Sequence, residues 1–128
     1  MDHDDYPIDP DMSEAQFQNR VIQTAKWLGW RVSHFRAALQ RSGRWSTPVQ
    51  GHSGFPDLTL ARDGVVIHAE LKTNKGRLSK DQKAWVDALG DTVRVWRPRD
   101  WDAILDELKK PARRSEAATA ATAAPPGT

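Results

Sequence analysis

The first regular pattern of apolar residues in the chain has the spacing of an amphipathic helix. Side chains three or four positions apart lie on the same side of a helix. The positions that share this face are Phe17, Val21, Ala25 and Leu28. Ser13 followed three residues later by Gln16 is a capping-box pattern, and Gly29 is typical of a helix end. The sequence therefore predicts a helix between Ser13 and Gly29.

Two strand-like segments, 57–62 and 65–72, are separated only by Asp63-Gly64. This dipeptide favours a type I′ turn, so the two segments are predicted to form a β-hairpin. Segments 30–35 and 92–97 also have strand character, and 36–56 is expected to be irregular.

Two further helices are predicted in the second half of the chain. Ser79 and Gln82 form a second capping-box pattern before a segment that ends at Gly90. Asp100 is the expected cap of a last helix, which carries Trp101 and Leu108. The predicted order is α-β-β-β-α-β-α, and the fold class is α/β, a mixed sheet flanked by helices.

The ends of the chain differ in composition from the segment between them. Residues 1–12 are acidic and contain two prolines, and 111–128 are rich in Ala, Thr and Pro. Both are expected to be disordered tails around one domain at 13–110. The chain has no cysteine, no apolar run of membrane-spanning length and no signal-peptide pattern. We therefore expect no membrane association and an intracellular, cytoplasmic location, the host cytoplasm if a phage encodes the protein.

The distribution of charge suggests a polyanionic partner. The first 12 residues hold five of the 17 acidic residues and no Lys or Arg, so residues 13–128 carry 19 basic and 12 acidic residues, a net charge of +7. Charge alone leaves nucleic acid, anionic lipid and a solvated basic surface all open.

The hairpin turn predicts which side chains face each other. If Asp63 and Gly64 are the two loop residues, the numbers of paired residues add up to 127, and Asp57 lies opposite Glu70. Strand alternation places His68 and Lys72 on the same face as this pair. The opposite face holds the apolar side chains of Leu58, Leu60, Ile67, Ala69 and Leu71.

Two facing carboxylates repel each other, so the sheet gains no stability from placing them together. Charges about 5 Å apart repel by about 3 kcal/mol at an effective dielectric of about 20. A hard divalent cation between the oxygens would reverse the sign, and oxygen ligands suit Mg²⁺ or Mn²⁺. The alternative is a solvated face with Lys72 as counter-ion.

Two helical residues point toward the same region. Glu14 lies on the apolar face of the first helix, or it is simply a first-turn acid favoured by the helix dipole. Gln82 lies in line with Trp85 and Leu89, and it also completes the second capping box.

These residues resemble a known signature. Gly54-Phe-Pro-Asp57, followed by Glu70-Leu-Lys72 on the next strand, is similar to the motif of the PD-(D/E)XK nuclease superfamily. An acid early in the first helix, Glu14, and a Gln on the helix after the Glu-Leu-Lys strand, Gln82, resemble its VRR-NUC branch. The resemblance covers about residues 13–108 and implies a restriction-endonuclease-like mixed sheet.

The resemblance implies a divalent-metal phosphodiesterase that uses Mg²⁺ or Mn²⁺. Asp57, Glu70 and the Leu71 carbonyl would bind the metal, and Glu14 would act directly or through a water. Lys72 would orient the attacking water or neutralise charge on the phosphate, and Gln82 would position the lysine, the water or the phosphate. His68 is either structural or an additional proton acceptor.

Contacts to DNA are expected from the polar and basic side chains near this face. They are Lys75, Arg77, Ser79, Lys80 and Lys83 after the Glu-Leu-Lys strand, and Arg36, Arg41 and Arg44 in the long loop. Trp45 could stack on an unpaired base.

The predicted function is a structure-selective DNA endonuclease for branched DNA such as Holliday junctions, with a role in recombination or repair. Paired cuts in such a substrate require a homodimer with two active sites. The alternatives are a nuclease for flaps or DNA ends, an RNA-directed nuclease, and a non-catalytic DNA-binding module.

Overall fold

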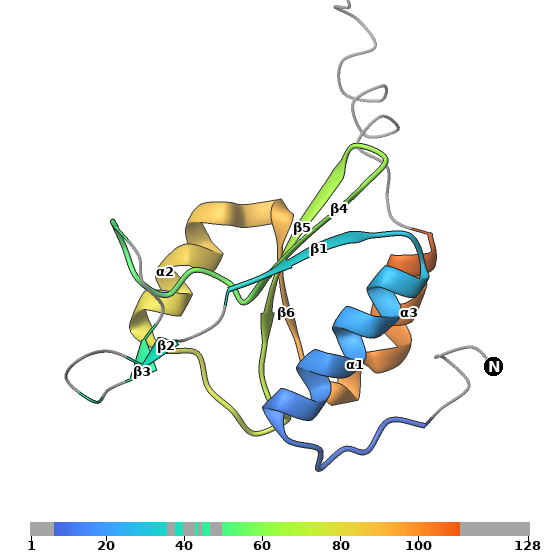
Figure 1. Ribbon diagram of the computed structural model, residues 1–128, viewed down its shortest axis with the longest axis horizontal. Helices are drawn as coiled ribbons and strands as arrows, with labels where there is room; N and C mark the ends of the chain where they lie inside the picture. Colours follow the sequence, from blue (N-terminus) through green and yellow to red (C-terminus); the bar gives the residue numbers. More distant parts are fainter. Residues whose placement is uncertain (1–6, 36–37, 40–42, 44, 47–49, 111–128) are drawn as a thin grey trace, which may run out of the picture.

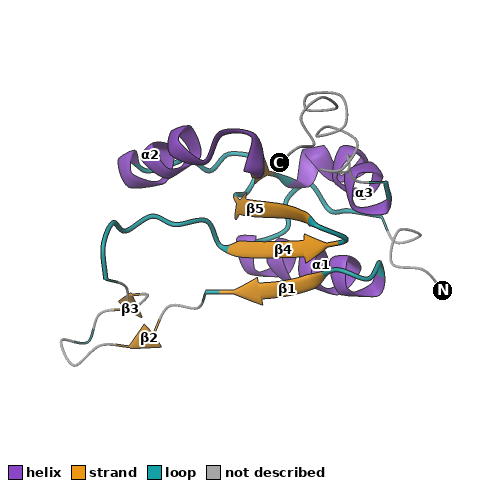
Figure 2. Cartoon of the chain, turned by 90° about the horizontal axis from the view of Figure 1, so that it is seen from above, coloured by secondary structure: helices purple, strands orange, loops and turns teal. Residues whose placement is uncertain are grey.

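The computed structural model describes residues 7–35, 38–39, 43, 45–46 and 50–110. Its main sheet has four strands in the order β1-β4-β5-β6. The strands are β1 (Arg31–His34), β4 (Leu58–Arg62), β5 (Val65–Leu71) and β6 (Val93–Trp96). The helices are α1 (Glu14–Trp27), α2 (Lys80–Leu89) and α3 (Trp101–Lys109). The fold is therefore mixed α/β, with β1 antiparallel to β4, β4 antiparallel to β5, and β5 parallel to β6 (Figures 1 and 2).

The hydrophobic core lies between one face of this sheet, α1 and α3. The five apolar side chains that alternation placed on that face are all buried: Leu58, Leu60, Ile67, Ala69 and Leu71. Phe17 and Val21 of α1 and Ile104 and Leu108 of α3 belong to the same cluster. No residue of α2 is buried. Figure 1 shows α1 and α3 together on one side of the strands and α2 on the other.

The hairpin has the predicted turn and register. Asp63 and Gly64 have φ angles of 50° and 83°, which a type I′ turn requires at both central positions. Leu58 pairs with Ala69 and Arg62 pairs with Val65, so the register prediction is confirmed. Because Asp57 directly precedes Leu58 and Glu70 directly follows Ala69, this register brings the two acids next to each other.

Both predicted capping boxes are present. Ser13 Oγ accepts from Gln16 N (3.1 Å) and Ser79 Oγ accepts from Gln82 N (3.1 Å). The prediction for Asp100 was wrong in detail, because its side chain makes no capping hydrogen bond to α3. Asp100 Oδ2 instead accepts from Arg97 N (3.0 Å) across the 3₁₀ turn Pro98–Asp100, which precedes the helix.

Two segments differ from the sequence-based expectation. Two short strands, β2 (Ala38–Leu39) and β3 (Trp45–Ser46), pair within the region predicted to be irregular. At the other end of the domain, Ile8 and Met12 pack against the core, so the packed part begins before residue 13. Residues 1–6 and 111–128 lie outside the described residues.

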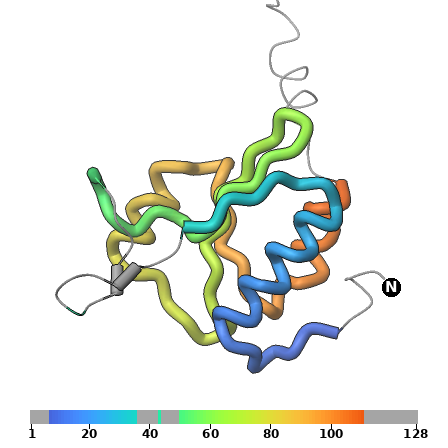
Figure 3. Tube along the Cα trace, viewed as in Figure 1, coloured from blue at the N-terminus to red at the C-terminus, as the bar shows by residue number. Residues whose placement is uncertain are grey.

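The loop between β5 and α2 returns to the segment that precedes α1 (Figure 3). Asn74 Nδ2 donates to the Pro10 carbonyl oxygen (3.0 Å). The end of β5 and the start of α1 are thereby held at the same edge of the molecule.

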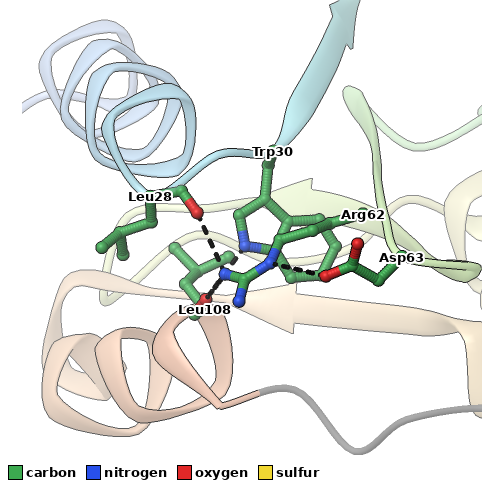
Figure 4. A network of polar contacts seen from close by, with 5 residues as sticks. All are labelled: Leu28, Trp30, Arg62, Asp63 and Leu108. Atoms are coloured by element: carbon green, nitrogen blue, oxygen red, sulfur yellow. Dashed lines mark hydrogen bonds and ion pairs between the residues drawn. The ribbon is translucent and has the colours of Figure 1, made fainter.

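At the opposite end of the β4–β5 pair, Arg62 joins the ends of α1 and α3 (Figure 4). Its Nη1 donates to the carbonyl oxygens of Leu28 (3.0 Å) and Leu108 (3.1 Å), and its guanidinium carbon lies 5.8 Å from the centre of the Trp30 ring. Trp30 Nε1 also donates to the Leu108 carbonyl oxygen (3.0 Å). Since the last carbonyls of a helix lack partners within it, one cation stabilises the ends of α1 and α3 together.

Within the part of the chain that is described, no helix is long and apolar enough to cross a membrane.

Candidate active site

Asp57 and Glu70 lie side by side at one end of the β4–β5 pair. Asp57 Oδ2 accepts a hydrogen bond from Leu71 N (2.9 Å), which holds this carboxylate against β5. Glu70 is only 2% exposed, an unusual burial for a carboxyl group. The two acids that the hairpin register predicted to face each other are thus in direct contact, since their carboxyl groups also share a hydrogen bond.

The electrostatics of this pair strongly favour a proton on Glu70. Burial, followed by the charge of Asp57 and the hydrogen bond with its carboxyl group, raises the pKa of Glu70 to about 8. Glu14 adds to the increase and Lys72 opposes it. Without a bound cation, Glu70 therefore keeps its proton at neutral pH.

Gln82 on α2 reaches the acid pair, through a contact with Glu70 that the sequence did not predict. Its Nε2 donates to Glu70 Oε2 (3.1 Å), while its Oε1 accepts from Ser79 N (2.8 Å). One side chain thus fills the predicted capping role and also contacts the acid pair. Gln82 thus fixes the orientation of the Glu70 carboxyl group.

Glu14 and Lys72 complete the charged group. Glu14 remains exposed in the first turn of α1, yet partial desolvation and the charge of Asp57 raise its pKa, with Lys72 opposing the increase. Lys72 directly follows β5 and is half-buried. Its charge acts on both glutamates, so all five predicted catalytic residues lie in one region of the surface.

The loop before Asp57 is held by contacts that the sequence analysis missed. Ser53 Oγ donates to Asp81 Oδ2 (2.7 Å), and Trp85 Nε1 donates to the Ser53 carbonyl oxygen (2.9 Å). Gly54 has a φ of +92°, and a Cβ there would lie 2.7 Å from the Asp81 backbone carbon. The signal was the glycine that opens the Gly-Phe-Pro-Asp string, because a backbone this close to a helix leaves no room for a side chain.

His68 has a structural environment. Its Nδ1 shares a hydrogen bond with Thr59 Oγ1 (3.0 Å), and its ring lies 5.3 Å from the Phe55 ring, edge to face. Burial lowers the pKa of His68, which favours the neutral ring. The Phe55 ring also packs against Trp85 at 4.8 Å, so this aromatic cluster connects β5, the loop and α2.

The predicted DNA-binding residues of the second half are all exposed. They are Lys75, Arg77, Ser79, Lys80 and Lys83. The Ser79 hydroxyl is already engaged as the helix cap. Arg36, Arg41 and Arg44 lie outside the described residues, and so does the side chain of Trp45.

The described residues contain no group of three or more His, Asp or Glu side chains that could hold a metal ion. The side-chain donors available are therefore the pair Asp57 and Glu70. One or two carboxylates, with water and substrate phosphate filling the remaining positions, are a common ligand set for Mg²⁺. The pair fits such an ion, whereas Glu14 as a direct ligand and the Leu71 carbonyl remain predictions.

No family model matches the chain, and comparisons with curated proteins and with solved structures find no match either.

Proposed function

We propose that this protein is a divalent-metal-dependent DNA endonuclease with a restriction-endonuclease-like fold and a PD-(D/E)XK-type site. One observation carries the proposal: Asp57 and Glu70 are in contact, and Glu70 is almost fully buried. Such a pair lowers stability when neither a proton nor a cation is bound, so stability does not explain its presence. A binding site for a divalent cation explains it.

The metal would be held by the carboxylates of Asp57 and Glu70, with the Leu71 carbonyl as a further ligand and Glu14 acting directly or through water. The hard oxygen donors favour Mg²⁺ or Mn²⁺. When bound, the dication supplies activation of a water molecule and neutralisation of phosphate charge.

The surrounding side chains have separate roles. Lys72 is the cation that orients the attacking water or stabilises charge on the phosphate. Gln82 holds the Glu70 carboxyl group through its 3.1 Å hydrogen bond and so keeps both Glu70 oxygens in a defined orientation. A bound metal would displace the proton of Glu70, because the two would compete for the same oxygens.

The proposed substrate is DNA, and branched DNA such as a Holliday junction in particular. Exposed cations follow directly after the catalytic strand, in the loop and on α2, where a phosphate backbone would pass the site. Four-way junctions have two-fold character, so we propose that two copies of the chain act together. Recombination or repair within the cytoplasm of a cell is the corresponding setting.

The first test is cleavage of labelled four-way junction, flap and plain duplex with Mg²⁺ or with EDTA. We expect the wild-type protein to cut the junction only with the metal. Asp57→Asn, Glu70→Gln and Lys72→Ala should each reduce cleavage at least about 100-fold and leave junction affinity within a few-fold. Asp87→Asn, an exposed acid on α2, is the matched control and should cut normally.

Thermal unfolding provides a readout that is independent of cleavage. Mg²⁺ should raise the Tm of the wild-type protein and of Asp87→Asn, but not that of Asp57→Asn, since ligands that bind only the native state stabilise it. Junction binding with no metal-dependent cutting would instead identify a non-catalytic DNA-binding module. Faster cutting of flaps or ends would change the substrate but not the chemistry.

A further inference from the structure

The turn that follows Lys72 is held by a side chain from the neighbouring strand. Arg97, directly after β6, donates from Nη1 to the carbonyl oxygens of Thr73 (2.7 Å) and Gly76 (2.6 Å). Gly76 N donates back to the Thr73 carbonyl oxygen (3.2 Å), which closes the turn. Hydrogen bonds from a charged donor at these lengths are among the stronger ones in proteins.

Two further contacts fix the same turn from other directions. Asn74 Nδ2 donates to the Pro10 carbonyl oxygen (3.0 Å), and Asn74 Oδ1 accepts from Arg99 N (2.9 Å). The turn at residues 73–76 is therefore tied to the end of β6 and to the segment before α1. We call residues 73–76 the platform, because these hydrogen bonds hold the turn in one position.

This platform lies directly against Lys72. A Cβ built on Gly76 would be 3.4 Å from Lys72 Cδ and 3.1 Å from Thr73 Oγ1, so the turn borders the aliphatic part of the lysine. Lys72 N also donates to the Trp96 carbonyl oxygen (3.0 Å), next to Arg97. The side chain of the lysine thus borders the turn that Arg97 holds, and its backbone is bonded to the residue that precedes Arg97.

We propose that Arg97 is a positioning residue for Lys72, acting through the turn at residues 73–76. Its Nη1 donates to the carbonyl oxygens of Thr73 and Gly76 and so holds the turn in place. The turn restricts the Lys72 side chain to the side of Asp57 and Glu70. Lys75 and Arg77 are the exposed cations on either side of Gly76, so the same contacts fix the loop that would meet the phosphates. The proposal rests on the proposed nuclease function, because it assigns Arg97 a part in that reaction.

Arg94, on β6 just before Arg97, provides a matched control. It is half-buried like Arg97 and also donates to two backbone carbonyl oxygens, those of Asp91 (2.7 Å) and Val93 (3.0 Å). Its guanidinium pairs with Glu107 on α3 (2.8 Å), away from the turn after Lys72. Arg94→Gln therefore removes comparable contacts without touching the platform.

The experiment compares steady-state junction cleavage by Arg97→Gln, Arg97→Lys and Arg94→Gln. We expect Arg97→Gln to lower kcat by roughly 10- to 100-fold with only a few-fold change in KM, since small misplacement of a catalytic group has effects of this size. Arg97→Lys should recover part of the loss, because an ammonium still donates to carbonyls but lacks the planar fork. Arg94→Gln should keep the wild-type kcat.

Gly76→Ala tests the same contact without removing a hydrogen bond. Its Cβ would crowd Thr73 Oγ1 (3.1 Å) and come into van der Waals contact with Lys72 Cδ (3.4 Å), so the turn must shift beside the lysine. We therefore expect kcat to fall several-fold while the Tm changes little.

Amide hydrogen exchange in metal-free protein gives a readout other than activity. Exchange at Gly76 should accelerate in Arg97→Gln and stay at the wild-type rate in Arg94→Gln. Equal kcat in Arg97→Gln and Arg94→Gln, with active wild-type protein, would overturn the role of Arg97 and leave the nuclease proposal standing. A wild-type protein that cuts no DNA would overturn both.

Discussion

A single carboxyl group, that of Glu70, shows most clearly that this surface is specialised. A glutamate that is 2% exposed, in contact with a second acid, lowers stability whenever it is ionised. Lys72 offsets part of that cost and Gln82 donates one hydrogen bond, but the pKa of Glu70 is still raised to about 8. The residue therefore keeps its proton at neutral pH, and the proposed dication would compete with that proton.

This proton makes stability depend on pH. The raised pKa means that native Glu70 keeps its proton between about pH 4.5 and 8, where an unfolded glutamate has lost it. In EDTA, the free energy of unfolding should therefore decrease as pH rises through this range, by up to about 1.4 kcal/mol per pH unit. The decrease should be much smaller in Glu70→Gln, which should be the more stable protein at pH 8.

Urea denaturation from pH 5 to 8.5 measures the effect, and Asp87→Asn serves as the control that keeps the wild-type slope. An equally steep slope in Glu70→Gln would show that another group carries the proton.

At the scale of elements, α2 and the loop before β4 depend on each other. Since no residue of α2 is buried and a helix this short is marginal alone, its position comes from a few contacts. These are the Ser53–Asp81 hydrogen bond, the bonds from Trp85 Nε1 to the loop carbonyls, and the packing of Phe55 on Trp85. The loop thereby carries Asp57 and the helix carries Gln82 to the same place.

Gly54→Ala should separate the two elements. The new Cβ would lie 2.7 Å from the Asp81 backbone carbon, at a φ of +92°. Gly51→Ala is the matched control, because Gly51 has a φ of +103° with nothing within 4 Å of a Cβ. Both variants store backbone strain of about 1–3 kcal/mol, and Gly54→Ala should lose clearly more stability and lose junction cleavage.

Chemical denaturation followed by tryptophan fluorescence measures the difference. Equal destabilisation by the two alanines would mean that the contact with α2 is unimportant.

At the scale of the whole molecule, acidic and basic groups are separated along one edge. The acid pair lies at the end of the sheet, and the exposed cations Lys75, Arg77, Lys80 and Lys83 follow it in the chain. At the other end of the strands, the Arg62 guanidinium is engaged by the carbonyl oxygens of Leu28 and Leu108. A polyanion is therefore expected at the edge that carries the acid pair, where a dication would also remove the repulsion between substrate and carboxylates.

The double variant Lys75→Ala, Arg77→Ala should weaken junction binding and reduce the slope of log Kd against log salt by about 2, since each lost phosphate contact removes about one released counter-ion. Lys26→Ala, Arg31→Ala has the same change in charge at the opposite end of the sheet, where Arg31 pairs with Ala61 near the turn. It should keep the wild-type slope. Identical slopes in all three proteins would place the DNA elsewhere.

The sequence by itself determined the features that local chemistry dictates. Asp63-Gly64 favours one turn type, that turn allows one register, and the register brings Asp57 to Glu70. Both capping boxes and the buried face of the hairpin followed in the same way, because caps and alternation depend on neighbours two to four residues apart.

Only the tertiary structure decided the contacts between distant segments. Ile8 and Met12 pack against the core, Gly54 meets Asp81, and Arg97 holds the turn after Lys72, although no local pattern in the sequence names the partner in any of these contacts. The physical reason is that each depends on the packing of elements far apart in the chain. The depth at which Glu70 is buried has the same origin, and that burial is what makes the two facing acids a candidate site.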